Sequence, residues 1–568
     1  MAGVMVTVHE TEIDGVLCFW ADLGRPLSAA HLHFRHGMAD EPLPEAGWLH
    51  LLEHLALRDR ATLQRPIHGS VGMLLTRFTA QGTPEVVAER LQALARWLDE
   101  PDLQLLARER GVLQAQAQRQ VDPLLASLTW RYGATGPGVA SYAEVGALRA
   151  TPELLAERSK RVFNRSNVVL VLDGPPPPTL SLPLPSGEYQ QPATSAPIDR
   201  TLPATYVDDT GLTLTGTVRR TYASTFLPGI LERAVHDGMR EHTGAVDGPW
   251  ARLVDVDDQL SVVGGGSVAQ RDDVTKTVEA GIEIAERLSR DGVPRGWFQE
   301  AVETRELELA SPEAALLVAH RSALAVLSDR VPQSLEEMVD ELHSTDPGAV
   351  DAAAREFHDT LLLGAPEHPI GRRDPVQLVS FPEHEPVGVV PRHRHVDWPA
   401  EAATFALDSQ TVERVSGLTA QVMRVSEVVS VFAWRDGTRQ LIGRDGSTLW
   451  MEPAEWRGGQ DLTAQLDASL PQDLRVPVPD RPGTFQRMAP AQLAATATIR
   501  FTRTVPGQIV IAAVCFLLGV VILSGGHAIV GGGLILATLC LAGRVAVVLR
   551  RAPVAAPDQD DLAALPSP

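Results

Sequence analysis

Cysteine is scarce in this chain of 568 residues, which contains three: Cys18, Cys515 and Cys540. No two of them form a C-x-x-C pair, and two of them lie in the apolar C-terminal region. The sequence therefore offers no disulfide framework, and a reducing compartment is the simpler interpretation.

Basic residues are also in short supply, because 50 Lys and Arg face 71 Asp and Glu and the formal charge is -21. A phosphate backbone is attracted by basic surfaces, so this balance disfavours a nucleic-acid-binding role. The first 15 residues, MAGVMVTVHETEIDG, lack both a basic stretch and a long apolar run. We therefore expect no secretory signal peptide.

Charge is missing altogether from residues 509–543, a run of 35 residues. A single membrane-spanning helix needs about 20 residues, so this run is too long for one crossing. The sequence SGGH at residues 524–527 supplies a turn and predicts a transmembrane helical hairpin over residues 505–549. The alternative is a buried helical pair in a soluble core, although soluble helices seldom stay uncharged for so long.

Arginines flank both ends of this apolar run, whereas its central turn has none. Because positively charged flanks stay on the cytoplasmic side, both chain ends are expected there. The predicted location is the cell membrane, in a multi-pass arrangement of two helices with the large domains in the cytoplasm. The flanking residues are Arg500, Arg503, Arg544, Arg550 and Arg551.

The first 388 or so residues are typical of two successive α/β units. Residues 1–175 alternate strand-like and helix-like stretches, beginning with two strands around a turn at Asp14 and Gly15. A Pro-rich linker is predicted over residues 176–203, followed by a second α/β domain over residues 204–388. The similar length and element order of the two segments suggest a duplicated unit.

Residues 391–480 have a different pattern, in which two Asp-Gly turn signals separate short strands and a short closing helix follows at residues 462–470. This pattern predicts a small β-rich domain, similar to pleckstrin-homology-like modules. Residues 552–568 are rich in Pro, Ala and Asp and are expected to be disordered. The predicted fold class is α+β: two α/β domains, a small β-rich domain and a C-terminal transmembrane hairpin.

The motif that carries chemistry is H-x-x-E-H at His50, Glu53 and His54, within GWLHLLEHLAL. On a helix, positions i and i+4 project from one face, so the two imidazoles can converge on one metal ion. Zinc lowers the pKa of a water molecule to about 7, and Glu53 is placed to take the proton from the water that attacks a peptide carbonyl. The alternative without a metal site is an amphipathic helix with two surface histidines.

The surroundings of the motif resemble the insulinase/pitrilysin family of peptidases, which carry this inverted zinc motif. The resemblance starts with HFRHGMADEPLPEAGWLHLLEH at residues 33–54 and continues through ERGVLQAQ at residues 109–116. It extends to GALRATPELLAERSKRVFNRSNVVLVLDG at residues 146–174, and residues 210–385 are similar to the family's second, non-metal domain. The resemblance implies an α/β fold, a Zn2+ cofactor held by His50 and His54, and peptide substrates.

The chain departs from the family where the third zinc ligand is expected. In the family this ligand is a glutamate seven residues after another glutamate; the first of the pair matches Glu109, and the ligand position falls on Gln116. A neutral amide is a poor zinc ligand beside two neutral imidazoles. Glu109 is about 10 Å away by helix rise and is predicted to support the site rather than to replace the ligand.

Other candidate residues follow from the resemblance or from composition. Arg240 matches the family's substrate-binding arginine, whereas the companion tyrosine is missing and Trp250 is the nearest aromatic residue. Further histidines could serve as replacement ligands, but each is more typical of a strand or loop position. They are His31, His33, His36 and His68.

Three functions remain open at this point. The first is a membrane-anchored zinc metalloendopeptidase that acts on peptides or unfolded segments in the cytoplasm. The second is a non-catalytic homologue that serves as a scaffold or as the regulatory half of a heterodimer, and Gln116 is the residue that separates these two. In the third, the small β domain is the functional part of the protein and binds a partner near the membrane. Since one pair of domains forms half of the family's closed chamber, we expect a homodimer or a heterodimer with a second family member.

Overall fold

The structure is a computed structural model, and it describes most of the chain up to residue 479. The predicted hairpin at 505–549 and the tail at 552–568 lie outside the described residues. In the part that is described, no helix combines the length and the apolar character needed to cross a membrane. The described residues are 7–58, 67–117, 122–142, 144–191, 196–208, 211–243, 248–267, 274–365, 377–378, 384–390 and 392–479.

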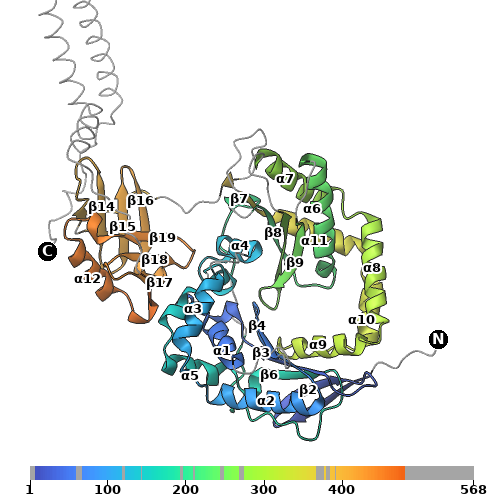
Figure 1. Ribbon diagram of the computed structural model, residues 1–568. Coiled ribbons are helices and arrows are strands. Elements are labelled where there is room, and N and C mark those ends of the chain that lie inside the picture. The colour runs from blue at the N-terminus through green and yellow to red at the C-terminus, as the bar shows by residue number, and fades with distance from the viewer. Residues whose placement is uncertain are drawn as a thin grey trace, which may run out of the picture.

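The first domain is built on a six-stranded sheet in the order β1-β2-β6-β3-β5-β4. Asp14 and Gly15 both have positive φ (52° and 82°), which gives the predicted hairpin between β1 and β2. Helices α1, α2, α3 and α5 lie together beside this sheet (Figure 1). The elements are β1 (Val8–Ile13), β2 (Val16–Ala21), β3 (Ala29–Arg35), α1 (Trp48–Leu57), β4 (Ile67–Val71), β5 (Leu75–Gln81), α2 (Pro84–Asp99), α3 (Leu106–Ala117), α5 (Pro152–Val162) and β6 (Val168–Leu172).

The second domain repeats this plan, with a sheet in the order β12-β7-β11-β8-β10-β9. Strands β7 to β11 take the places and directions of β2, β3, β4, β5 and β6, including the parallel pair β7–β11 that matches β2–β6. Only the outer edge strand differs, since β1 precedes its unit and β12 follows its own. The elements are β7 (Ala204–Val207), β8 (Leu212–Arg219), α6 (Leu227–Thr243), β9 (Trp250–Asp255), β10 (Leu260–Ser267), α7 (Val274–Arg290), α8 (Arg295–Leu309), α10 (Leu335–Ser344), α11 (Pro347–Asp359), β11 (Leu362–Ala365) and β12 (Gln377–Leu378).

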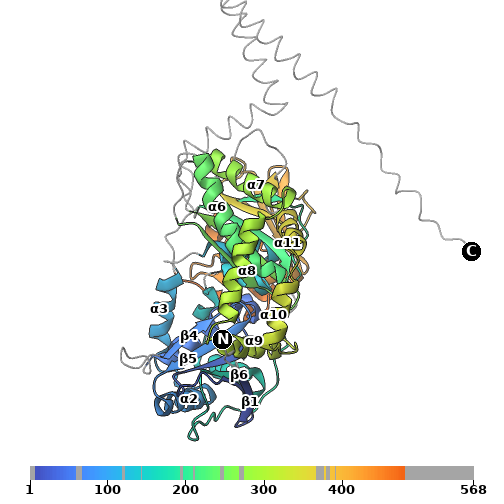
Figure 2. The same cartoon turned by 90° about the vertical axis from the view of Figure 1, so that its right-hand side faces the viewer.

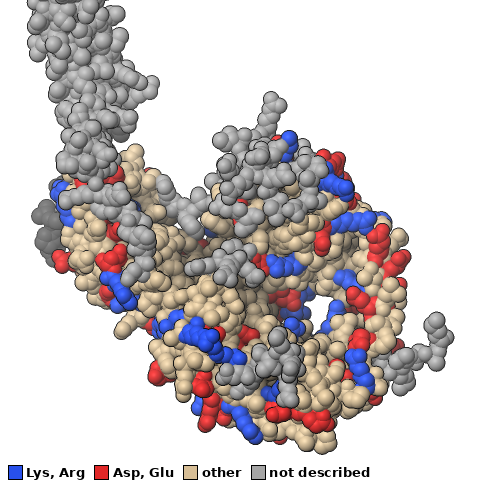
Figure 3. Space-filling model, viewed as in Figure 1, with Lys and Arg blue, Asp and Glu red and all other residues tan. Residues whose placement is uncertain are grey.

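The duplicated sheets and their helices confirm the predicted α+β class. In the space-filling view, a hollow opens between the two domains, with acidic and basic side chains at its rim (Figure 3). Figure 2 shows the second domain stacked above the first. The two six-stranded sheets are separate, with no pairing between their described strands.

Each domain lends one helix to the other's sheet. Helix α9 (Ala314–Val326) of the second domain packs Ala319 and Ala323 against Phe19 and Val171 of the first sheet, and Figure 1 shows it lying beside β6. In return, α4 (Pro123–Tyr132) of the first domain reaches the second sheet. This exchange joins the two domains through packed side chains rather than through the covalent linker alone.

Helix α4 reaches the second sheet because that sheet makes room for it. Gly264 on β10 faces Leu124, and a Cβ at Gly264 would come within 2.7 Å of the leucine side chain. Arg131 is 3 % exposed and donates to the backbone oxygens of Thr360 at 2.9 Å and Thr215 at 3.0 Å. Burial lowers the pKa of Arg131 to about 10, and the acceptors that hold its charge are neutral oxygens of the second domain.

The small third domain has two four-stranded sheets and one helix, and its pleckstrin-homology-like character stays a prediction. It packs Ile442 against Leu43 and Ala134 of the first domain, and the Ala134 N–H donates to the Arg444 oxygen at 3.0 Å. The elements are β13 (Arg392–Arg394), β14 (Ala403–Leu407), β15 (Thr411–Ser416), β16 (Thr419–Arg424), β17 (Val428–Ala433), β18 (Arg439–Gly443), β19 (Thr448–Met451), α12 (Gly459–Ser469) and β20 (Arg475–Pro477).

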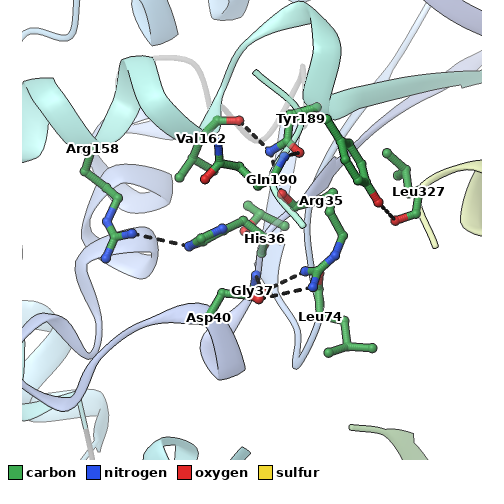
Figure 4. A network of polar contacts seen from close by, with 12 residues as sticks. Arg35, His36, Gly37, Asp40, Leu74, Arg158, Val162, Tyr189, Gln190 and Leu327 are labelled. Carbon is green, nitrogen blue, oxygen red and sulfur yellow. Dashed lines mark hydrogen bonds and ion pairs between the residues drawn. The ribbon is translucent and has the colours of Figure 1, made fainter. Parts of the chain in front are cut away.

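The Pro-rich stretch predicted as a linker packs closely where it is described. Leu182 and Leu184 are buried in the core of the first domain. The Tyr189 hydroxyl donates to the Leu327 oxygen at 2.8 Å, beside the end of α9, and the Gln190 N–H donates to Asn167 at 3.2 Å (Figure 4). The stretch therefore ties the first domain to the exchanged helix.

The loop that leads from β3 to α1 is held by buried charge. The Arg35 guanidinium donates two hydrogen bonds to the Asp40 carboxylate, at 2.7 and 3.1 Å, and the Gly37 N–H donates to the same carboxylate at 2.9 Å. His36 faces the Arg158 guanidinium at 3.3 Å, as Figure 4 shows. These contacts fix the direction in which the chain enters the HxxEH helix.

Candidate metal centre

Helix α1 carries the motif, and a buried carboxylate caps its N-terminus. Glu41 accepts hydrogen bonds from the backbone N–H groups of Gly47 at 2.9 Å and Leu49 at 2.8 Å. These donors have no partner within the helix, and an anion at this end interacts favourably with the helix dipole. Burial raises the pKa of Glu41 to about 7, although Arg158 and the two N–H donors oppose the shift. The cap holds α1 at a fixed position relative to the loop before it.

The three motif residues gather on one side of α1. Nε2 of His50 lies 3.9 Å from the Glu53 carboxylate, and Nε2 of His54 lies 3.8 Å from it. The two imidazole rings meet edge to face, with centroids 4.7 Å apart. One ligand atom from each residue lies within 4.8 Å of the others, and the described residues contain no other such group of three or more His, Cys, Asp or Glu.

The opposite ring nitrogens each face a second carboxylate. Nδ1 of His50 lies 2.5 Å from the Glu144 carboxylate, and Nδ1 of His54 lies 3.5 Å from the Glu109 carboxylate. A carboxylate at Nδ1 favours the tautomer that carries its proton there, which leaves the Nε2 lone pair available. Both histidines are thus oriented so that Nε2 points toward Glu53.

The charges of the cluster shift the proton equilibria of its members. Burial lowers the pKa of His50, but the hydrogen bond and charge of Glu144, together with Glu53 and Glu41, outweigh it and raise that pKa above its usual value. Burial raises the pKa of Glu53. Burial and the neighbouring His50 lower the pKa of His54. The site therefore contains a carboxylate that holds a proton more readily than usual beside one imidazole that releases it more readily.

The motif opens into a cavity of about 660 Å³ that reaches the exchanged helix α4. Gly69 on β4 lies against Glu53, where a Cβ would overlap the carboxylate. Asp122, the N-cap of α4, lines the cavity and contacts Arg252 of the second domain. The cavity is thus formed by the first domain, with a cation of the second domain at its edge.

Gln116 and Glu109 both lie on α3 but in different places. Gln116 is exposed near the end of α3 and lines the cavity into which the motif opens. Glu109 is buried and contacts His54 and Arg58. Its contact is with Nδ1, the far side of the ring, so its position agrees with a supporting role.

The remaining candidates lie away from the cluster. Arg240 is exposed on α6 and is not among the residues that line the cavity, so its substrate-binding role stays a prediction. Trp250 starts β9 and stacks with Arg252 at 5.3 Å. His31 and His33 pack against His320 of α9, His36 faces Arg158, and His68 is exposed on β4.

Glu144 is the site residue that the sequence analysis missed. It lies 94 positions after His50, before a 3-10 helix, η4 (Val145–Arg149), and its φ of 57° is one that glutamate seldom adopts. No motif or periodicity marks such a position. The long-range contact arises only when α1 and η4 pack together.

The donors present fit a zinc ion. Zinc prefers imidazole nitrogen and carboxylate oxygen, at about 2.0–2.2 Å. His50 and His54 offer two nitrogens on adjacent turns as ligands. The Glu53 carboxylate, within 4.8 Å of both nitrogens, lies beside them as a proton acceptor rather than as a third ligand. The carboxylates at both Nδ1 atoms are the outer contacts that metal-binding histidines usually have.

A search against protein-family models and curated proteins found no match. Solved structures do match. A protease from Helicobacter pylori is similar at 11% identity and a TM-score of 0.51, covering 64% of this chain and 99% of that one. A chain of complex III2 from Candida albicans is similar at 13% identity and a TM-score of 0.50, covering 63% and 96%.

Pitrilysin is also similar, at 16% identity and a TM-score of 0.48, and this chain covers 46% of its length. The chain thus spans about half of pitrilysin, and 65% of the chain takes part in the match. The similarities to the Helicobacter pylori protease and to the complex III2 chain show a fold shared over 63–64% of this chain. At these identities they concern the fold alone.

Proposed function

We propose that this protein is a zinc metalloendopeptidase that acts on peptides or unfolded segments. The observation that carries the proposal is the arrangement of His50, Glu53 and His54, with both Nε2 atoms within 3.9 Å of the Glu53 carboxylate. The adjoining cavity, with a volume of about 660 Å³, gives a substrate access to this group.

His50 and His54 would hold the zinc ion through Nε2, and their Nδ1 atoms stay fixed by Glu144 and Glu109. Zinc, when bound there, supplies the Lewis acidity that polarises a peptide carbonyl and acidifies a water molecule. Glu53 accepts the proton of the attacking water and delivers it to the leaving amine. Gly69 leaves space for the Glu53 carboxylate on the strand side.

The test is a comparison of metal content and peptide cleavage in the full-length chain. Wild type is expected to bind about one equivalent of zinc and to cleave an unfolded peptide. Glu53→Gln should retain the metal and lose about 10²- to 10⁴-fold in cleavage, because only the proton acceptor is removed. His54→Ala should lose both. Cleavage that survives Glu53→Gln would contradict the assigned role of Glu53.

A non-catalytic scaffold, or the regulatory half of a heterodimer, is the second candidate function. It is favoured by Gln116, an exposed neutral amide where the resembling family has an anionic ligand. Under this hypothesis the wild type holds little zinc, and Gln116→Glu raises the affinity. Zinc binding and cleavage by the wild type would exclude it.

Membrane anchoring, the cytoplasmic location of the large domains and association with a family partner belong to the same proposal. The 35 uncharged residues at 509–543 and their arginine flanks support the first two. Reporter fusions at residues 1 and 568 should give the same cytoplasmic signal, and opposite signals would contradict the hairpin. A strictly monomeric full-length chain in sedimentation, with no partner recovered, would contradict the association.

A further inference from the structure

We propose that Glu144 is a positioning residue of the metal centre: acting through His50, it supplies the negative charge that Gln116 cannot supply. This inference rests on the proposed zinc site. It assigns Glu144 to the outer contact of a metal-binding histidine rather than to the metal itself, because the Glu144 carboxylate meets Nδ1, whereas Nε2 faces Glu53.

The backbone at Glu144 is held in an unusual conformation. Its φ of 57° and ψ of 33° are left-handed, a region that costs energy for any residue with a Cβ. In this conformation the Glu144 carboxylate lies 2.5 Å from His50 Nδ1, and the glutamate side chain is 26% exposed. The contact with His50 offsets the energy that this left-handed conformation costs.

Helix α1 leaves space for Glu144 at its N-cap residue. Gly47, the N-cap, has a φ of 91°, and a Cβ there would lie 2.6 Å from the Glu144 Cβ and 3.2 Å from its backbone oxygen. Glycine is therefore needed both for the turn and for the approach of Glu144. The helix that carries His50 thus begins at the point where Glu144 packs against it.

The turn that follows Glu144 is tied to the same helix. The Trp48 Nε1–H donates to the Gly146 oxygen at 2.9 Å, and Gly146 lies so close to Ala46 that a Cβ would approach its N atom to 2.4 Å. Strand β20 of the small domain also packs against η4. Glu144 is consequently anchored by contacts that do not involve its own carboxylate.

The two histidines differ in how closely their outer carboxylates approach. The Glu109 contact with His54 is 3.5 Å long, and Arg58 shares that carboxylate, whereas the Glu144 contact with His50 is 2.5 Å. A carboxylate at Nδ1 increases the basicity of Nε2 and fixes the ring, and its removal typically weakens metal affinity about 10- to 100-fold. The effect at His50 should be the larger of the two.

The experiment measures Zn²⁺ affinity of the full-length protein by competition with a chromophoric chelator, and records the visible absorption of the Co²⁺-loaded form. Glu144→Gln and Glu144→Ala should bind Zn²⁺ about 10- to 100-fold more weakly than wild type, with an altered Co²⁺ spectrum. The matched control is Asp122→Asn, which removes a negative charge from the same cavity without touching either histidine and keeps a good helix cap. Its affinity should stay within about two-fold of wild type.

A double variant tests whether charge is the cause. Adding Gln116→Glu to Glu144→Ala should raise the Zn²⁺ affinity at least ten-fold above that of Glu144→Ala alone, because the new glutamate supplies a negative charge to the site. Wild-type affinity in both Glu144 variants would overturn this inference and leave the proposed function standing. A wild type that binds neither Zn²⁺ nor Co²⁺ would overturn both.

Discussion

The two sheet domains share the order and directions of five strands, yet only the first assembles a metal-binding group among the described residues. The difference lies in two equivalent helices: α1, which follows β3 in the first domain, and α6, which follows β8 in the second. In the second domain α6 packs along α7, and Gly238 of α6 lies so close to Ile284 that a Cβ would approach it to 2.6 Å. In the first domain α1 contacts α2 only slightly, and its histidine side faces a cavity.

The repeated topology is therefore a scaffold, and the chemistry depends on which face of one helix is left uncovered. A helix covered by its neighbour contributes to the core, whereas the equivalent helix beside a cavity presents polar side chains. The exchanged helix α4 belongs to both environments, because it lines the cavity beside α1 and also packs on the sheet of the second domain.

The largest effect is expected where the two domains are joined. Arg131→Met should destabilise the protein by about 2–5 kcal/mol, because the buried oxygens of Thr360 and Thr215 lose their donor. Urea unfolding of the full-length chain measures it. The control is Arg252→Met, whose partly exposed ion pair with Asp122 contributes at most about 1 kcal/mol. Equal effects of the two variants would show that α4 does not hold the domains together.

A smaller effect is expected from pH, through the histidines beneath α9. Burial, with a smaller contribution from the Arg77 charge, lowers the pKa of His31 and of His320 to about 4. The neighbouring His31 adds to the shift at His320, and Asp173 opposes the shift at His31. Since the unfolded chain binds more protons between pH 4 and 6.5, stability should be complete above pH 6.5 and fall by on the order of 2–3 kcal/mol toward pH 4. His320→Gln should flatten this dependence, and an unchanged slope in that variant would exclude His320 as its source.

The smallest effects on stability are expected from replacing single glycines by alanine in the two domains. Gly238→Ala should cost about 1–2 kcal/mol of stability, because the new methyl group overlaps Ile284 while the helix gains propensity. Gly69→Ala should leave stability nearly unchanged but lower cleavage about 10- to 100-fold, because it displaces Glu53. Gly229→Ala, exposed on α6 with no atom within 4 Å of the new group, is the control and should stabilise slightly. Loss of cleavage in Gly238→Ala at full stability would contradict the comparison.

The repeat and the motif helix were predictable because their signals are local. Alternating apolar residues and the turn at Asp14 and Gly15 predict strands, and the H-x-x-E-H spacing places three side chains on one face of a helix. The exchange of α4 and α9 was not predictable in this way. Helix α9, AALLVAHRSALAV, is apolar on most of its surface, and nothing in that pattern says which sheet it covers.

Glu144 was out of reach for a related reason. Its role depends on a contact with a residue 94 positions earlier and on a left-handed conformation that glutamate does not favour. A single sequence indicates the conformations that short segments prefer. Here the site is completed by Glu144, whose backbone adopts a left-handed conformation that glutamate disfavours. The membrane hairpin stays a prediction, since residues 505–549 lie outside the described part.

The exchange of α9 also sets an order of events during synthesis. The outer face of the first sheet, with Phe19, Val169 and Val171, is complete in sequence once β6 has emerged, but α9 follows about 150 residues later. At about 5–20 residues per second, the ribosome needs about 8–30 s to deliver it. Throughout this interval the nascent first domain displays an apolar sheet face without its cover, so we expect slower translation to prolong the exposure of a surface that is prone to aggregate.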